Sequence, residues 1–223
     1  MGLGKTCQVI SFLSAIMDKT GDARLDRSIP ELSPLEELEL LGEFEFTKLV
    51  LDKDAAVEPN YDKPYPILIV CPSSLIDNWG NEFDKWGTFR AVKLVGSAKK
   101  LDEGLEKILH GKAEVAIASY ERVRINVEKF EVIPWHAAIF DEVHKVKSPK
   151  AQLTIAAHRL QTKLRFGLSG TPMPNGYEEL FNVIDFLNPG SLGSAEEFKN
   201  RFSVPLRVGM QASASLDEIA EVS

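Results

Sequence analysis

Short apolar runs of strand length alternate along this chain with segments whose apolar residues recur at helical spacing. The run between Pro66 and Pro72 holds five consecutive apolar residues, which is the pattern of a strand buried on both faces. Residues 5–19 instead predict a helix with one apolar face for packing on a sheet. That face has apolar residues at i, i+3, i+4 and i+7, namely Val9, Phe12, Leu13 and Ile16.

The two patterns repeat toward the C-terminus. Further strands are predicted at residues 91–95, at 114–118, in the run that ends at Asp141, and at 164–168. Helices are predicted at residues 73–86, 98–111 and 150–160, from Ser119 onward, and in a segment whose apolar face carries Leu180, Phe181, Ile184 and Leu187. Strands that alternate with helices favour a parallel, doubly wound sheet. We therefore predict an α/β fold with helices on both faces of the sheet.

Residues 20–64 interrupt this alternation. They contain four prolines, and residues 21–64 carry 12 acidic against 5 basic side chains. We interpret them as a solvated, partly disordered insertion that could also dock a partner. The apolar pattern thins again from about Val204. Residues 1–203 are therefore predicted to form one domain, and residues 204–223 a polar tail or the beginning of a further segment.

Composition narrows the possible partners and compartments. The net charge of −7 belongs to the insertion, because the rest of the chain has equal numbers of acids and bases, so a nucleic-acid partner is not excluded. Trp79, Phe83 and Trp86 recur at helical spacing, which we interpret as packing rather than base stacking. Two cysteines give no disulfide framework, and no apolar run is long enough to span a membrane.

The predicted strand that begins at His136 ends in two adjacent carboxylates, Asp141 and Glu142. In an open α/β sheet, ligands bind beyond the carboxyl ends of the strands. Asp141 at such a position can hold Mg²⁺, and Glu142 can orient or deprotonate a water molecule. A strand followed by a solvated acidic turn would have the same sequence.

The chain opens with Met1-Gly2-Leu3-Gly4-Lys5-Thr6, which ends like a phosphate-binding loop. In such loops backbone N–H groups cradle phosphates, the lysine reaches the β- and γ-oxygens, and the threonine hydroxyl ligates Mg²⁺. The predicted helix that follows supplies the required context, although Gly-Lys-Thr also occurs by chance. The first glycine of the full motif and the strand before it would precede Met1, so we expect the sheet to lack its first strand.

The order of three motifs resembles the first RecA-like lobe of superfamily 2 helicase-type motors. These motifs are Gly-Lys-Thr opening a helix, Asp141-Glu142-Val143-His144 ending a strand, and Ser169-Gly170-Thr171-Pro172 ending a later strand. Gln8, the Pro72–Leu75 string with Asn78-Trp79, and Ser119-Tyr120-Glu121 are similar to further motifs of the Snf2 family. Residues 187–202 are most similar to its Cockayne-syndrome-B-like branch, in particular to excision-repair 6-like 2 proteins.

The resemblance implies roles for individual positions. Gly2, Leu3, Gly4, Lys5 and Thr6 would bind ATP, Thr6 and Asp141 would hold Mg²⁺, and Glu142 would activate the attacking water. His144, Ser169, Gly170 and Thr171 would couple the nucleotide state to DNA contact, and Ser73, Ser74 and Tyr120 would lie on the DNA side. Pro174 stands where the family usually has glutamine, which puts the coupling motif in doubt.

The resemblance also implies a function for the whole protein. It would be a nuclear, DNA-dependent ATPase that tracks along double-stranded DNA in chromatin remodelling or repair, with a second RecA-like lobe and possible chromatin or repair partners for the acidic insertion. Two alternatives remain: a different P-loop NTPase, and a catalytically inactive protein-interaction module on the same fold.

The composition of the insertion generates a first prediction. Because proline and dense acidic residues disfavour a packed core, limited proteolysis should cut the chain first within residues 21–64. Mapping the early fragments by mass spectrometry checks this. Uniform resistance of that segment, with first cuts elsewhere, would contradict the interpretation.

Overall fold

The computed structural model describes residues 4–28, 66–162, 164–170 and 176–209. Within these residues five parallel strands form one sheet in the order β2-β3-β1-β4-β5. The strands are β1 (Ile67–Cys71), β2 (Ala91–Lys93), β3 (Val115–Ser119), β4 (Ala137–Asp141) and β5 (Leu164–Leu168). The predicted α/β fold is confirmed. The expectation that the sheet lacks its first strand stays a prediction.

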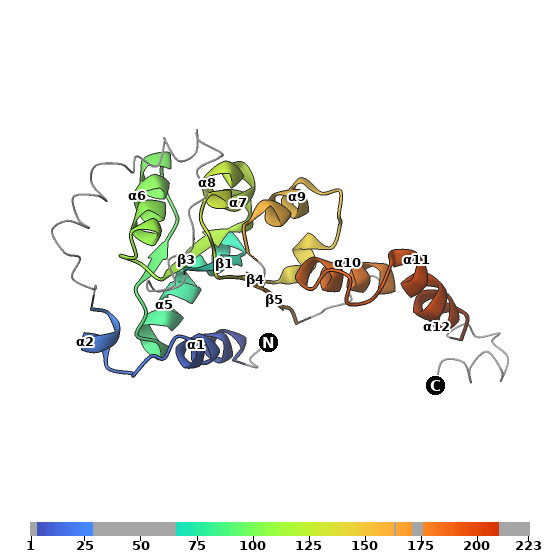
Figure 1. Ribbon diagram of the computed structural model, residues 1–223, viewed down its shortest axis with the longest axis horizontal. Coiled ribbons are helices and arrows are strands. Elements are labelled where there is room, and N and C mark those ends of the chain that lie inside the picture. Colours follow the sequence, from blue (N-terminus) through green and yellow to red (C-terminus); the bar gives the residue numbers. More distant parts are fainter. Residues whose placement is uncertain (1–3, 29–65, 163, 171–175, 210–223) are drawn as a thin grey trace.

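Helices cover both faces of the sheet (Figure 1). On one face lie α1 (Lys5–Ile16) and α5 (Ile76–Trp86), the latter preceded by the 3-10 helix η1 (Ser73–Leu75). On the other lie α6 (Ala98–Leu109), α7 (Tyr120–Ile125), α8 (Val127–Glu131), the 3-10 helix η2 (Val143–Val146), α9 (Gln152–Arg159) and α10 (Tyr177–Leu187). None of the described helices has the length and apolar character needed to cross a membrane.

The alternation of side chains along β1 divides the core into two layers. Ile67, Ile69 and Cys71 join the cluster under α1 and α5, whereas Leu68 and Val70 join the cluster under the opposite helices. Every residue of β1 and β4 is buried, because each of these strands pairs on both sides and is covered on both faces. Their continuous apolar runs therefore follow from their central position in the sheet.

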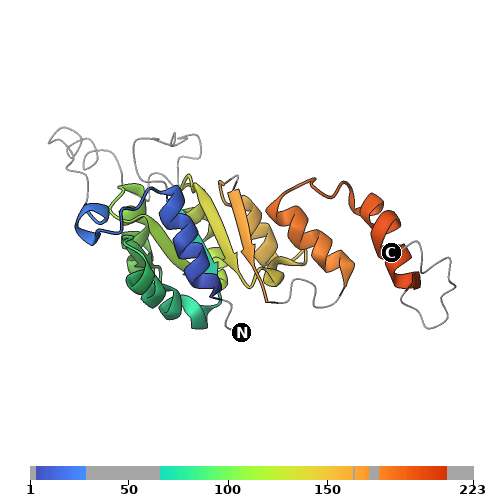
Figure 2. The same cartoon turned by 90° about the horizontal axis from the view of Figure 1, so that it is seen from below.

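The apolar face predicted for the first helix is partly wrong. Val9, Ile10 and Leu13 are the residues of α1 that are buried, whereas Phe12 is 43% exposed and Ile16 is 46% exposed. Figure 2 shows α1 lying across the sheet near its β4–β5 side. Phe12 meets Phe166 of the edge strand β5, with 5.5 Å between ring centroids. Since β5 has a described neighbour on one side only, this part of the helix face extends beyond the covered area.

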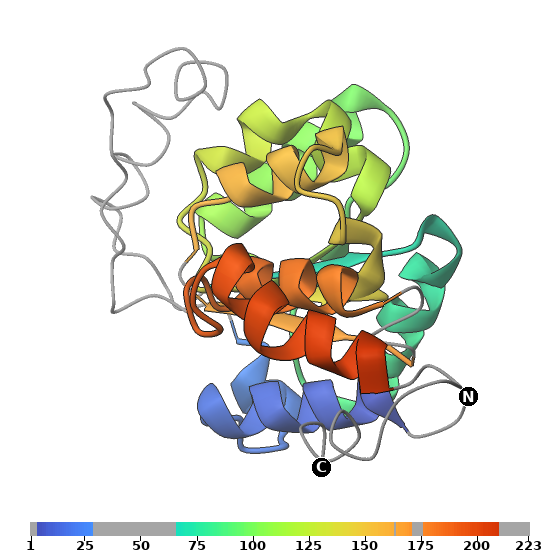
Figure 3. The same cartoon turned by 90° about the vertical axis from the view of Figure 1, so that its right-hand side faces the viewer.

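The C-terminal helices form an arm at the β5 side of the sheet (Figures 1 and 3). The helices α11 (Ala195–Phe198), the π-helix η3 (Lys199–Ser203) and α12 (Val204–Gly209) follow one another without a break. Phe198 packs on Phe181 of α10, with ring centroids 5.2 Å apart. Residues 204–209 thus continue a helix, and residues 210–223 lie outside the described part of the chain, so the predicted boundary at residue 203 stays a prediction.

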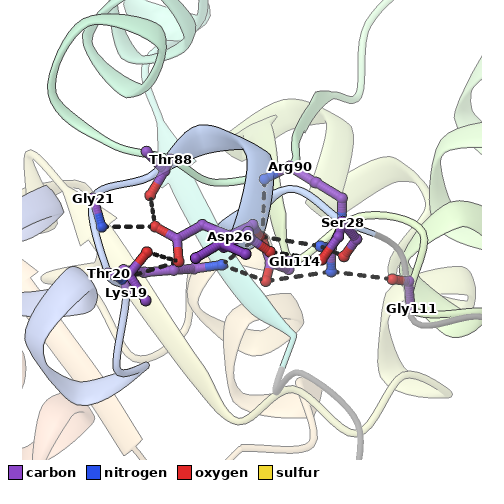
Figure 4. A network of polar contacts seen from close by, with 10 residues as sticks. Lys19, Thr20, Gly21, Asp26, Ser28, Thr88, Arg90, Gly111 and Glu114 are labelled. Atoms are coloured by element: carbon purple, nitrogen blue, oxygen red, sulfur yellow. Dashed lines mark hydrogen bonds and ion pairs between the residues drawn. The ribbon is translucent and has the colours of Figure 1, made fainter.

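One carboxylate near the start of the predicted insertion is buried against the domain, although the residues around it are exposed. The short helix α2 (Ala23–Asp26) places Asp26 where its carboxylate accepts hydrogen bonds from the Thr20 and Gly21 backbone and from the Thr20 and Thr88 hydroxyls (Figure 4). These donors, first among them the Thr88 hydroxyl, hold the pKa of Asp26 well below its usual range. The solvated interpretation is thus wrong for Asp26, while the other residues of 20–28 are exposed. It stays a prediction for residues 29–64, which lie outside the described part of the chain.

A second buried carboxylate completes this network. Glu114, which immediately precedes β3, accepts a 2.7 Å contact from Lys19 Nζ and a 3.3 Å contact from the Arg90 guanidinium. Lys19 Nζ also donates to the backbone oxygen of Asp26 (3.1 Å). The two carboxylates together attach the segment after α1 to the residues that precede β2 and β3.

The Asp26 contacts predict a pH-dependent stability. In Asp26→Asn the hydrogen bonds to a charged acceptor are lost, so the melting temperature should fall at neutral pH. A carboxylate with a depressed folded-state pKa stabilises above its unfolded pKa of about 4 and loses that effect as pH falls further. The melting-temperature gap to wild type should therefore narrow below about pH 4, measured by calorimetry. Asp84→Asn, at an exposed neighbour, is the control and should show a small gap; a D26N gap that is unchanged at acid pH would contradict the assignment.

Candidate nucleotide-binding site

The sequence motifs converge at the carboxyl ends of β4 and β5. Lys5 Nζ, in the first turn of α1, lies 3.5 Å from Glu142 Oε1, although the two residues are 137 positions apart. His144 Nδ1 lies 3.3 Å from Glu142 Oε2 and 3.4 Å from Ser169 Oγ. The structure therefore brings together residues from three separate motifs.

The backbone of Glu142 is folded in an unusual conformation. Its φ of 56° and ψ of 52° are left-handed, a region that non-glycine residues seldom occupy. The turn is held by the Glu142 N–H, which donates to Asp141 Oδ1 (3.0 Å), and by the burial of Val143 and Val146 in η2. Strained backbone of this kind persists where the surroundings fix it, and here it aims the Glu142 carboxylate at Lys5 and His144.

Asp141 is buried at the end of β4, and its carboxylate has two described donors. Trp79 Nε1 donates to Oδ2 at 2.9 Å, and the Glu142 N–H occupies Oδ1. The main-chain oxygen of Asp141 accepts the Tyr120 hydroxyl at 2.9 Å. Burial, reinforced by the charge of Asp141, raises the pKa of Cys71 to about 12, and the same two causes raise that of Tyr120. Both groups therefore stay protonated beside the carboxylate.

The position of Tyr120 corrects one expectation. Its side chain is 5% exposed and its hydroxyl is bound to Asp141, so this side chain is not presented to a DNA backbone. Ser73 and Ser74, by contrast, are exposed in η1, directly beyond the carboxyl end of β1. The difference arises because η1 lies outside the sheet, whereas Tyr120 begins a helix that packs on it.

The N-terminus of α1 has the features of a phosphate cradle. Gly4 adopts a left-handed φ of 64° before the helix, and the first turn contains no acidic residue. Unpaired N–H groups at a helix start attract anions, and a carboxylate there would repel them. Thr6 is half-buried in this turn. Gly2, Leu3 and Thr171 lie outside the described residues, and Gly170 is the last one described in its motif.

The donor set fits Mg²⁺ bound together with a nucleotide. Mg²⁺ prefers oxygen ligands and is usually held by one or two carboxylates plus substrate phosphates rather than by a complete protein cage. Asp141 and Thr6 supply a carboxylate and a hydroxyl of this type. The described residues contain no cluster of three or more His, Cys, Asp or Glu that could hold a metal ion.

Trp79 is the residue of this site that the sequence pattern did not identify. Its helical spacing with Phe83 and Trp86 indicated packing. This is confirmed for Trp79 and Phe83, which are buried with ring centroids 6.1 Å apart, but not for Trp86, which is 51% exposed. The pattern gave no partner for its indole N–H. One signal was available. Trp79 lies on the helix that follows β1, and β1 pairs with β4, the strand that ends at Asp141.

Comparison with known proteins agrees with this geometry. The fold is that of a RecA-like ATPase lobe: the chain superposes on the "Sulfolobus solfataricus SWI2/SNF2 ATPase core in complex with dsDNA" with a TM-score of 0.54 and 24% identity, over 78% of this chain and 33% of that one. Residues 1–222 match the SNF2-related domain, so the chain belongs to that family.

Two curated relatives illustrate the extent of the similarity. The chain is 37% identical to mouse "DNA excision repair protein ERCC-6-like 2", over 99% of this chain and 13% of that protein. It is 36% identical to "Switch 2" of Arabidopsis thaliana, over 96% of this chain and 21% of that protein. The expected resemblance to excision-repair 6-like 2 proteins is confirmed. The chain spans less than a quarter of the length of either relative.

The left-handed glycine at the start of α1 generates a testable prediction. Gly4→Ala should cost about 1 kcal/mol in folding stability through backbone strain and also misdirect the N–H groups of the cradle. Loss of one such contact to a charged phosphate should weaken ATP binding about 10-fold or more, measured by calorimetric titration of the full-length protein.

A matched control separates the two effects. Gly111 has the same φ of 64° and, like Gly4, has open space where a Cβ would stand, but it lies between α6 and β3. Gly111→Ala should show a similar loss of stability with unchanged ATP affinity. Equal ATP affinities for the two variants would contradict a phosphate cradle at Gly4.

Proposed function

We propose that this chain is the ATP-binding lobe of a DNA-dependent ATPase and translocase of the Snf2 type, acting in the nucleus in chromatin remodelling or DNA repair. The observation that carries the proposal is the contact between Lys5 and Glu142 at the carboxyl ends of the strands. Two residues with complementary proposed roles in phosphoryl transfer meet there, although 137 positions separate them along the chain. Membership of the SNF2-related family supports the same conclusion.

Each side chain has a chemical task in this proposal. Lys5 and the first turn of α1 bind the phosphates, and Thr6 and Asp141 hold Mg²⁺. When bound, Mg²⁺ neutralises developing charge on the phosphate oxygens. Glu142 accepts a proton from the attacking water. His144, which contacts both Glu142 and Ser169, keeps that carboxylate oriented and connects it to the end of β5.

The proposed partner is the backbone of double-stranded DNA. Ser73 and Ser74 lie exposed beyond β1, on the same edge of the sheet as the nucleotide residues. Hydroxyl groups are common donors to phosphate oxygens, and such contacts carry no sequence information. We therefore expect binding without sequence preference, shared with a second RecA-like lobe of the full-length protein. The acidic residues of segment 29–64 are a proposed contact for chromatin or repair proteins.

Two substitutions in the full-length protein test the proposed roles. Glu142→Gln keeps the size of the side chain but cannot take a proton from water, so ATP turnover should fall about 10²–10⁴-fold with ATP binding retained. Lys5→Ala removes a charged contact to phosphate and should weaken ATP binding about 10–100-fold. Phosphate release and equilibrium nucleotide binding measure the two effects.

Matched controls are available on the opposite part of the surface. Glu131→Gln matches Glu142→Gln, because it removes a negative charge from an ion pair with Arg159. Lys129→Ala matches Lys5→Ala, because it removes a positive charge from an ion pair with Asp102. Both should retain wild-type turnover. If Glu142→Gln and Lys5→Ala also hydrolyse ATP at the wild-type rate, the site assignment is wrong, and an inactive interaction module becomes the better interpretation.

The 223-residue chain alone should hydrolyse ATP negligibly, with or without DNA. Phosphoryl transfer also needs positive charge on the side opposite Lys5, and an arginine supplied there is worth about 10³–10⁵ in rate. In the Snf2 family this arginine comes from the second lobe. A phosphate-release assay on the isolated chain, repeated on the full-length protein, checks the prediction. DNA-stimulated turnover by the isolated chain would contradict it.

A further inference from the structure

The indole of Trp79 makes a buried polar contact that packing alone does not require. Trp79 lies on α5, is 1% exposed, and donates from Nε1 to Asp141 Oδ2 at 2.9 Å. An indole N–H can only donate a hydrogen bond, so its partner must be an acceptor. A buried tryptophan needs some partner, but a backbone carbonyl is sufficient: Trp135 Nε1 donates to the Phe130 oxygen at 2.9 Å.

The contact fixes the carboxylate in one orientation. Oδ1 of Asp141 is held by the Glu142 N–H and Oδ2 by Trp79, so rotation of the carboxyl group would break both bonds. Trp79 is itself held in place, because Phe83 packs beside it and Ile76 of the same helix face is buried. A rigid donor on a packed helix is the arrangement that orients a metal-binding carboxylate most firmly.

The helix that carries this donor begins at the exposed serines. Ser73 and Ser74 lie in η1, and α5 starts at the next residue after that turn. Trp79 is therefore attached, through one continuous helical segment, to the part of the surface that we propose faces DNA.

We propose that Trp79 is a positioning residue for the divalent-cation site, holding the Asp141 carboxylate in its metal-binding orientation through the indole N–H. This inference rests on the function proposed above, and it assigns to a packing residue a part in that function. Loss of a hydrogen bond that orients a metal ligand typically weakens metal binding about 10–100-fold.

The test compares Trp79→Phe with wild type in the full-length protein. Phenylalanine keeps an aromatic ring in the core and removes the N–H. The primary measurement is Mn²⁺ binding to the ADP-saturated protein, followed by electron paramagnetic resonance of the free ion, since Mn²⁺ accepts the same oxygen ligands. Mn²⁺ affinity should fall about 10-fold or more, and the Mg²⁺ concentration for half-maximal ATP turnover should rise in parallel.

The chain offers a control that removes a comparable bond elsewhere. Trp135→Phe deletes a buried indole hydrogen bond of the same length, and Trp135 belongs to the opposite core layer from Trp79. It should lower the melting temperature with no change in Mn²⁺ or Mg²⁺ dependence. A second variant, with benzothienylalanine at position 79, replaces the N–H by sulfur in a ring of nearly the same shape and should reproduce the metal defect even if Trp79→Phe is unstable.

The outcomes distinguish this inference from the proposed function. If wild-type protein hydrolyses ATP in a Lys5-dependent manner but both position-79 variants match Trp135→Phe in Mn²⁺ affinity, the positioning role is wrong and the function stands. If wild-type protein neither binds Mn²⁺ with ADP nor hydrolyses ATP, both are wrong. A metal defect confined to the position-79 variants supports the inference.

Discussion

A carboxylate buried at the end of a central strand imposes the main constraint on this domain. Removing a charged group from water is costly unless hydrogen bonds replace the lost hydration. Asp141 meets this requirement with one donor from α5 and one from the turn that follows β4. The turn can supply its donor only by folding back on itself, and in doing so it directs Glu142 toward Lys5 and His144. The orientation of the site thus follows from satisfying one buried charge.

The central strands were predictable from the sequence because the sheet buries both of their faces. The apolar run 67–71 and the strand at 164–168 have the bounds found in the structure. Burial on both faces explains the continuous apolar signal of the first run, whereas β5 is a partly exposed edge strand. The proximity of the candidate site residues was predictable for a related reason: parallel strands place their carboxyl ends at one edge, so motifs at strand ends lie near one another.

The features that sequence patterns missed depend on partners far along the chain. Asp26 lies in a segment with the composition of a solvated acidic insertion, and its contacts with Thr88 and Arg90, 62 and 64 positions away, join it to the folded domain. Tyr120 and Trp79 were interpreted through neighbouring residues, whereas their polar atoms bind Asp141, 21 and 62 positions away. Phe12 shows the converse limit. Helical periodicity identifies an apolar face but not how far the sheet beneath it extends.

The strand order also governs how the domain can be assembled during synthesis. The central strand β1 pairs with β3 and β4, both of which come later in the chain, and residues 29–65 separate it from the helices that precede it. When β1 emerges from the ribosome, its neighbours β3 and β4 have therefore not yet emerged. Contacts between distant segments form slowly, and unpaired apolar strands associate readily with other chains. We expect β1 to depend on chaperones until residue 141 has emerged, which makes the rate of translation over this interval important for the yield of folded protein.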